Sequence, residues 1–264
     1  MPIFLVTNDD GAASPALPLL IDGLSALGTV RVAVPAHEQS WKGKAMTRFG
    51  QVRVQRRPEL GEQAFAVEGT PADCVNLGVH NLFDGPPDWV ISGINIGANI
   101  GLSFLLNSGT VGAAMEGALL GLPAVAFSLR TTKAMFAQWS DTGRIGGRAE
   151  QRALGHAAGN AVRVMRAVLK HGLPAGAMVL NVNFPIAVSP STPIRWTHLL
   201  ENRYGPLFDK EPQGEGYRHR YQGDSWRDPA QGSDWDVVEG GEISVTPLTF
   251  SRLTHPPGKP FPLE

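Results

Sequence analysis

The chain has little of several features that mark whole classes of protein. Its 264 residues include one cysteine, Cys74, which excludes an internal disulfide and fits a reducing cytoplasm. The formal net charge is −1, so neither sign is in excess to favour nucleic acid or a membrane surface. The sequence lacks an apolar stretch of membrane-spanning length and a basic N-terminal region with a signal core. These absences predict a cytoplasmic protein that binds neither nucleic-acid duplexes nor membranes.

Several common catalytic and cofactor motifs are absent as well. The seven histidines never show the spacing of a zinc site, and the sequence has no Walker loop and no G-x-S-x-G elbow. The glycine-rich stretch 93–101 lacks G-x-G-x-x-G and does not open directly into a helix. Dinucleotide cofactors such as nicotinamide and flavin nucleotides are therefore not expected.

What the sequence does contain is an alternation of strand-like and helix-like runs. Apolar residues make up 42% and charged residues 18%, which is typical of a folded core. We predict strands over residues 3–7, 30–34, 51–55, 64–67, 89–92, 124–127 and 178–181. We predict helices over 15–27 with Ser14 as N-cap, 71–82 with Thr70 as N-cap, 110–120 and 148–170. This order predicts an α/β fold, a mostly parallel sheet with helices on both faces, over residues 1–190.

The C-terminal part, residues 191–264, reads as an extension. Residues 201–235 are rich in Gly, Asp, Arg, Tyr and Trp without helical period, and we interpret them as an arm or extended hairpin. A long loop folded over its own domain is the alternative. A returning strand is expected over 242–247. The arm's aromatic residues predict a subunit contact; they are Tyr204, Phe208, Tyr217, Tyr221 and Trp226.

The first strand ends in two adjacent carboxylates, Asp9 and Asp10, followed by Gly11. Like charges side by side repel each other, and a divalent metal with oxygen ligands offsets that repulsion. Both carboxylates can reach one ion only if the chain has begun to turn, which Gly11 permits. A solvated turn with an Asx-type cap is an equal alternative for this segment.

Three segments follow predicted strands and should meet at one rim of the sheet, because ligands bind beyond the carboxyl ends of parallel strands. They are residues 8–11, 35–40 and 92–101. Their Asp, Ser and Asn side chains offer the hard oxygens that Mg²⁺, Mn²⁺ or Ca²⁺ prefer. For Asn95 and Asn99, a left-handed turn conformation is the alternative.

A phosphate site is possible where Ser108, Gly109 and Thr110 begin a helix of small residues. Amides without partners and the positive end of the helix dipole favour an anion there. An ordinary helix N-cap is the competing interpretation of Ser108. Asp73 is expected to be a first-turn acid, and Glu116 either supports the site or is a satisfied helix residue.

Taken together, these motifs resemble the SurE family of survival proteins, which are metal-dependent nucleotidases. The match lies in residues 7–11 (TNDDG), 69–75 (GTPADCV), 92–95 (SGIN) with Gly97, Asn99 and Gly101, and 108–111 (SGTV) with 114–117 (AMEG). Weaker similarity follows over 181–185, 232–235 and 244–248. The resemblance spans nearly the whole chain.

The resemblance implies a Rossmann-like domain, an extension exchanged between subunits, and homodimers or homotetramers. It implies hydrolysis of nucleoside 5′- and 3′-monophosphates by metal-activated water, in some members with polyphosphate as a further substrate. It implies one divalent metal ion per subunit, with Mg²⁺ or Mn²⁺ expected in preference to Ca²⁺. The metal ligands implied by the family motifs are Asp9, Asp10, Ser40 and Asn95. Catalytic roles fall on Asn8, Asp9, Ser108 and Thr110. Substrate binding falls on Asn8, Asn95, Ser108, Gly109 and Thr110.

The chain departs from the family pattern at positions that the resemblance implies for contact with the phosphate. Gln39 stands before the ligand serine where the family usually has Arg, and Ala45 replaces a second serine. Ile96 replaces a residue that is often Arg, and Asn107 a common Tyr or His. A lysine at 42 or 44 would be a substitute cation. These changes motivate a second hypothesis, a metal-dependent nucleotide-binding or regulatory protein with weak or no turnover.

Overall fold

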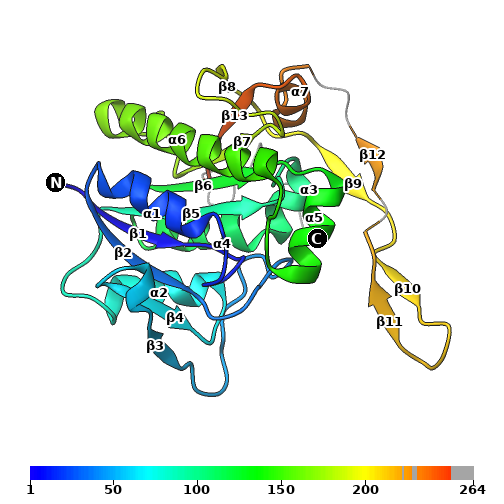
Figure 1. The fold of residues 1–264 in the computed structure, drawn as a ribbon, viewed down its shortest axis with the longest axis horizontal. Helices are drawn as coiled ribbons and strands as arrows, with labels where there is room; N and C mark the ends of the chain where they lie inside the picture. The colour runs from blue at the N-terminus through cyan, green and yellow to red at the C-terminus, as the bar shows by residue number, and fades with distance from the viewer. Residues whose placement is uncertain (222, 228–230, 251–264) are drawn as a thin grey trace, which may run out of the picture.

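A computed structural model gives the fold and describes residues 1–221, 223–227 and 231–250. Its centre is a nine-stranded sheet of order β3-β4-β2-β1-β5-β6-β7-β13-β8 (Figure 1). Six neighbouring strands run parallel: β4 (Ala64–Val67), β2 (Thr29–Pro35), β1 (Ile3–Thr7), β5 (Trp89–Ile96), β6 (Ala124–Leu129) and β7 (Val179–Phe184). The predicted mostly parallel α/β sheet is confirmed.

Antiparallel pairs extend this sheet at both edges. β3 (Val54–Arg56) lies antiparallel to β4, so the strand predicted over 51–55 begins three residues later and ends one residue later than expected. At the other edge β13 (Ile243–Leu248) runs antiparallel to β7, and β8 (Ile194–Trp196) pairs parallel with β13. Two strands of the C-terminal part therefore belong to the central sheet, while the division at residue 190 stays a prediction.

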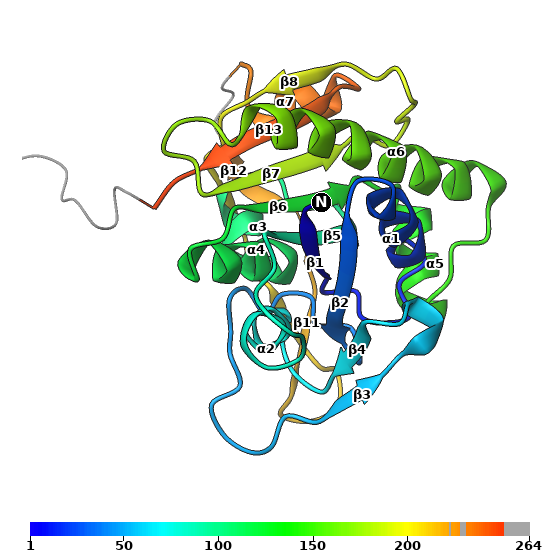
Figure 2. The ribbon, with the colours of Figure 1, turned by 90° about the vertical axis from the view of Figure 1, so that its left-hand side faces the viewer.

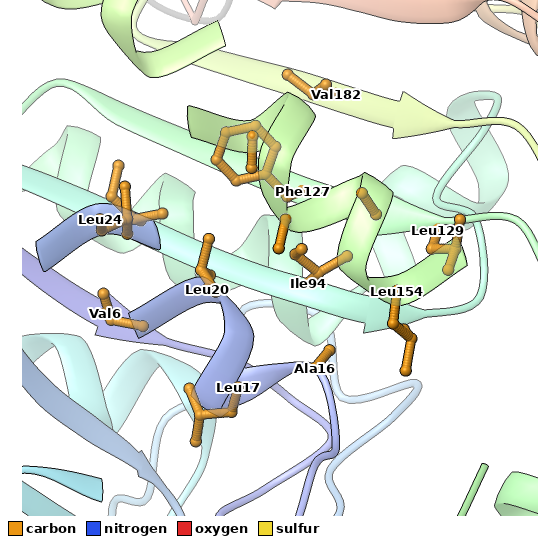
Figure 3. Packing of buried hydrophobic residues seen from close by; sticks show 14 of the residues in the cluster. Val6, Ala16, Leu17, Leu20, Leu24, Ile94, Phe127, Leu129, Leu154 and Val182 are labelled. Carbon is orange, nitrogen blue, oxygen red and sulfur yellow. The ribbon is translucent and has the colours of Figure 1, made fainter. Parts of the chain in front are cut away.

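Helices cover both faces of the sheet (Figure 2). α1 (Leu17–Ser25) and α6 (Arg148–His171) pack together on one face, and α2 (Pro71–His80) and α4 (Gly109–Leu119) on the other. Figure 3 shows Leu20 and Leu24 of α1 beside the strand residues Val6 and Ile94. Both leucines are fully buried, and each contributes about 1.5–3 kcal/mol by leaving water. The buried apolar residues between the helices and each face of the sheet hold the strand ends in place.

Three short helices and one turn were not predicted. They are α3 (Leu102–Asn107), α5 (Lys133–Thr142), α7 (Asp234–Glu239) and a 3₁₀ turn, η1 (Pro58–Leu60). The first predicted helix also begins later than expected, at Leu17, and Ala16 takes the N-cap position. Ser14 is not the cap, because its hydroxyl donates to Asp10 Oδ2 at 3.5 Å instead.

Of the arm predicted over 201–235, residues 201–221 and 223–227 project from the body beside α3 and α5 and are called the arm below (Figure 1). Residues 222 and 228–230 lie outside the described residues, and Asp234 and Trp235 belong to α7. β9 (Asn202–Tyr204) pairs antiparallel with β12 (Asp224–Arg227), and β10 (Phe208–Lys210) with β11 (Tyr217–His219). The expected extended hairpin is thus present as two antiparallel strand pairs that follow one another along the arm. Residues 251–264 of the predicted extension lie outside the described residues. Within the described chain, no helix combines the length and hydropathy that a membrane span requires.

Candidate functional site

The end of β1 turns sharply and buries two carboxylates. Asn8 closes the turn, because its Oδ1 accepts from the amide of Gly11 at 3.1 Å and its Nδ2 donates to Gly11 O at 3.0 Å. Gly11 has φ +85°, and a Cβ there would lie 3.0 Å from the backbone of His37. Asp9 and Asp10 are only 3% and 4% exposed. The solvated-turn alternative is therefore wrong, and the Asx-type turn belongs to Asn8.

Asp9 is held by the first turn of α4. The amide of Thr110 donates to Asp9 Oδ2 at 3.0 Å, and the Thr110 hydroxyl donates to Oδ1 at 2.5 Å. Gly109 makes this approach possible, since a Cβ there would lie 2.8 Å from Asp9 Cβ. The positive end of the α4 dipole therefore faces a carboxylate of this chain. Ser108 caps the helix by accepting from the amide of Val111 at 3.1 Å, as the N-cap interpretation predicted.

Asp10 is held by the end of β5. Its Oδ2 accepts from the amide of Ile96 at 3.0 Å. Among the described residues, neither Asp9 nor Asp10 forms an ion pair. Burial raises the pKa of both carboxyl groups, and the charge of Asp9 raises the pKa of Asp10 further. Two buried carboxylates without a cation match the donor set of a hard divalent ion.

Asn95 lies on the same rim because β5 continues past the predicted end at Ser92 to Ile96. The Asn95 Nδ2 donates to Gly97 O at 2.7 Å, which orients the amide. Among described non-glycine residues only Trp41 has a positive φ, so the left-handed alternative for Asn95 and Asn99 is wrong. The side-chain Nδ2 of Asn99 donates to Ser128 Oγ, and its backbone N–H donates to Asn183 Oδ1. We therefore interpret Asn99 as a structural residue.

The loop after β2 supplies the third part of the rim. Ser40 is exposed, and its amide donates to Glu38 Oε1 at 2.6 Å. Ser40, Asp9, Asp10, Asn95 and Ser108 all line one cavity of about 1110 Å³. The predicted convergence of the three segments on one rim is confirmed. Thr110 and Gly109 lie behind Asp9 and do not line the cavity.

The cavity also has walls that the sequence did not predict. One face of α5 lines it with Lys133, Phe136 and Ser140. The spacing of these residues, three and four apart, is a helical signal that was available in the sequence. The other wall is aromatic; its residues are Trp41, Phe104, His219 and Tyr221. His219 and Tyr221 come from the arm, and no local pattern connects them to β1.

Two further sequence questions have clear answers. Lys44 Nζ lies 2.6 Å from Glu116 Oε2, and Asn76 Nδ2 donates to Glu116 Oε1 at 3.0 Å. Glu116 is thus a satisfied helix residue, and Lys44 is engaged by it and does not line the cavity. Asp73 forms the expected first-turn capping box with Thr70 and also accepts from the loop residue Thr47.

The fold and the cavity define a Rossmann-like α/β protein with a buried carboxylate pair at the carboxyl ends of parallel strands. The model of the survival protein SurE family matches residues 4–206. The chain belongs to the SurE family.

Solved and curated relatives agree with this assignment. The 5′-nucleotidase SurE of Geotalea daltonii is 40% identical over 95% of this chain and 94% of its own. The 5′-nucleotidase SurE 1 of Thermus thermophilus is 39% identical, with 95% and 93% covered. The crystal structure of the SurE protein from Aquifex aeolicus has a TM-score of 0.74 at 32% identity, and the match covers 94% of this chain and 93% of that chain.

Proposed function

We propose that the protein is a divalent-metal-dependent nucleotidase that hydrolyses nucleoside 5′-monophosphates, and 3′-monophosphates as well. The names of its relatives support the reaction. The observation that carries the proposal is the buried pair Asp9 and Asp10. Both carboxylates line the cavity, and neither forms an ion pair with a described residue.

The proposed metal ligands are Asp9, Asp10, Ser40 and Asn95, with one ion per subunit, Mg²⁺ or Mn²⁺ before Ca²⁺. Their oxygens suit a hard cation, and each of the two carboxylates keeps at least one lone pair beyond the hydrogen bonds it accepts. When bound, such an ion supplies a Lewis acid that polarises a phosphoryl oxygen and makes water a better nucleophile.

The protein's own residues divide into two groups around this site. Thr110 gives both its amide and its hydroxyl to Asp9, so we assign it as a positioning residue. Asn8 likewise spends both polar atoms of its side chain on the turn at Gly11. Ser108 lines the cavity at the start of α4 and is our candidate for contact with the phosphate, while Gly109 permits the close packing of α4 on Asp9.

A nucleotide-binding protein with weak turnover is the second candidate, and the charges of the cavity favour it. Among the residues that the structure describes, Lys133 is the only lysine or arginine on the cavity wall. Ile96 is buried, and the Asn107 amide donates to Ser103 O and to Tyr204 Oη. The positions that differ from the family pattern therefore add no cation for phosphate.

One assay separates the two candidates. Phosphate release from AMP should require added Mn²⁺ or Mg²⁺ and stop when a chelator is present. Binding of AMP without phosphate release, measured by calorimetry under the same conditions, would favour the second candidate. Metal-independent release would contradict the proposed site.

We also propose that the protein is a cytoplasmic homodimer or homotetramer joined through the arm. Phe208 and Tyr217 at the arm's outer strands are 61% and 66% exposed, which is unusual for rings in a monomer. Light scattering at micromolar concentration tests the assembly, and a single-chain mass would contradict it.

A further inference from the structure

Four rings form one wall of the cavity, which we call the aromatic wall: Trp41, Phe104, His219 and Tyr221. The ring centroids of Trp41 and His219 lie 4.8 Å apart, and those of Phe104 and Tyr221 lie 5.1 Å apart. Trp41 and Phe104 are 5.8 Å apart and join the two pairs. The rings come from the loop after β2, from α3 and from the arm, and α3 lies on the side of the molecule from which the arm projects (Figure 1).

The aromatic wall is open to the cavity rather than closed on itself. Trp41 is 37% exposed and Tyr221 is 40% exposed. Most of the ring pairs meet edge to face, with interplanar angles of 61° for Trp41 and His219 and 83° for Phe104 and Tyr221. A flat, weakly polar ring that lies on this wall would bury apolar surface that is now in water.

Two polar side chains at the aromatic wall, those of Tyr221 and Asn107, already donate hydrogen bonds within the protein. Tyr221 Oη donates to Asp224 Oδ1 at 2.9 Å. Asn107 Nδ2 donates to Ser103 O at 2.8 Å and to Tyr204 Oη at 3.4 Å. Neither Tyr221 Oη nor Asn107 Nδ2 therefore has a hydrogen left to donate to the edge of a ligand ring, and what the wall offers such a ring is chiefly aromatic surface.

The cavity has two kinds of lining, which suit the two parts of one ligand. Asp9, Asp10 and Asn95, which we call the carboxylate end, line the same space of about 1110 Å³ as the aromatic wall. A phosphate alone would leave the aromatic wall unused. A nucleotide has a phosphate at one end and a planar base at the other.

We propose that the aromatic wall binds the nucleobase of the substrate by stacking, so that the enzyme prefers purines to pyrimidines and tolerates changes on the base edge. This inference rests on the proposed nucleotidase function and names how its site selects the substrate. Stacking is sequence-tolerant because every base has a π-face, and the larger purine face stacks better.

The test compares substrates with and without a base. Trp41→Leu should raise KM for AMP by roughly 10-fold, within the range measured for one stacked base, and Tyr221→Leu should raise it in the same direction. The KM for ribose 5-phosphate should change by less than about 2-fold, because that substrate has no base to stack. An equal loss on both substrates would overturn the proposal.

Matched variants of exposed rings control for the substitutions. Trp196→Leu removes a 64% exposed tryptophan from β8, and Phe49→Leu removes an 80% exposed phenylalanine from the loop before β3; neither lines the cavity. Both should leave the ratio of AMP to ribose 5-phosphate activity unchanged. In the wild type, AMP, IMP and GMP should have similar KM values, below those of UMP and CMP. A difference above about 10-fold among the three purines would show hydrogen-bonded reading of the base edge and overturn the proposal.

A binding measurement separates this inference from the proposed function. Calorimetric titration with adenosine, which has no phosphate, should show binding to the wild type that is weakened in Trp41→Leu. If the protein releases no phosphate with any added metal, the nucleotidase function fails. Weaker adenosine binding in Trp41→Leu would still support the aromatic wall as a base site. If turnover occurs and Trp41→Leu binds adenosine as the wild type does, the function stands and the aromatic wall is not the base site.

Discussion

The carboxylate end of the cavity and the aromatic wall are built by opposite means. At the carboxylate end, Asp9 and Asp10 are buried and held by backbone amides of Thr110 and Ile96. At the aromatic wall, rings are half-exposed and contact mainly one another. The first is fixed by the central sheet and α4, whereas the second depends on an arm outside that sheet. Changes at the two ends should therefore affect different measured quantities.

The largest effect is expected at the carboxylate end. Asp9→Asn or Asp10→Asn should lower kcat by about 10³-fold and weaken metal affinity, because each removes a formal charge from a site of hard oxygen ligands. Asp22→Asn, which changes an exposed acid on α1, should leave both quantities unchanged. Steady-state kinetics and metal titration measure the effect, and circular dichroism checks the fold. Full activity in both site variants would rule out the metal assignment.

The next effect concerns the hydrogen bonds that orient Asp9. Thr110→Val keeps the shape of a fully buried side chain and removes its hydroxyl. We expect kcat/KM to fall roughly 10- to 10³-fold, with metal affinity also reduced, because Asp9 loses a charge-assisted hydrogen bond. Ser108→Ala should instead raise KM for phosphate substrates as well as remove the helix cap. If Thr110→Val changes thermal stability alone, Thr110 is only a structural residue.

At the other end of the comparison, the outer part of the arm can be removed without cutting the sheet. Within the part of the chain that the structure describes, β10 and β11 pair only with each other, so replacing residues 207–220 by a short linker should leave the body folded. We expect a smaller particle by light scattering, and nucleotide KM higher by roughly 10-fold because His219 is lost. Unchanged mass and unchanged KM would show that the arm serves neither assembly nor the aromatic wall.

The smallest effect is expected at the base of the arm. Asp234 accepts from the amides of Leu200 and Gly101, both at 2.9 Å, and burial raises its pKa although these hydrogen bonds and nearby His198 oppose the rise. A raised folded-state pKa adds stability that is fully present below the unfolded pKa of about 3.9 and is lost as pH rises through the folded pKa.

Thermal unfolding of the wild type and Asp234→Asn tests this sign. The wild type should be the more stable, and the Tm difference should widen by a few degrees as pH falls from about 7 to 4, because the variant does not titrate there. A difference that narrows as pH falls would show that the hydrogen bonds outweigh burial at Asp234.

The carboxylate end was open to prediction because its signals are local. A strand that ends in Asp9 and Asp10, and a helix that begins at Ser108, can each be recognised within a few residues. Parallel strand order then places them on one rim. The hydrogen bonds between Thr110 and Asp9 could not be predicted, since they span 101 positions and depend on how α4 packs on the sheet.

Other differences between prediction and structure concern side chains whose partners cannot be read from the sequence. Ser14 looks like a helix cap, yet its hydroxyl points to Asp10, four residues back in the turn. Lys44 looks like a free cation, yet it pairs with Glu116 on α4. The aromatic wall joins Trp41 to His219 and Tyr221, and only the folded arm brings them together. For Lys44 and the aromatic wall, tertiary contact decided between side-chain roles that local sequence leaves open, whereas Ser14 has its partner within the same turn.

The place of β13 in the sheet has a consequence for biosynthesis. β13 lies between β7 and β8 although it follows both in the chain, and among the described strands β8 has no other partner in the sheet. On the ribosome, β1 to β7 can assemble first, while β8 and the arm emerge with nothing to pair against. This edge of the sheet gains β13 only when residues 243–248 are made, and until then the unpaired backbone N–H and C=O groups of β7 stay open to other chains.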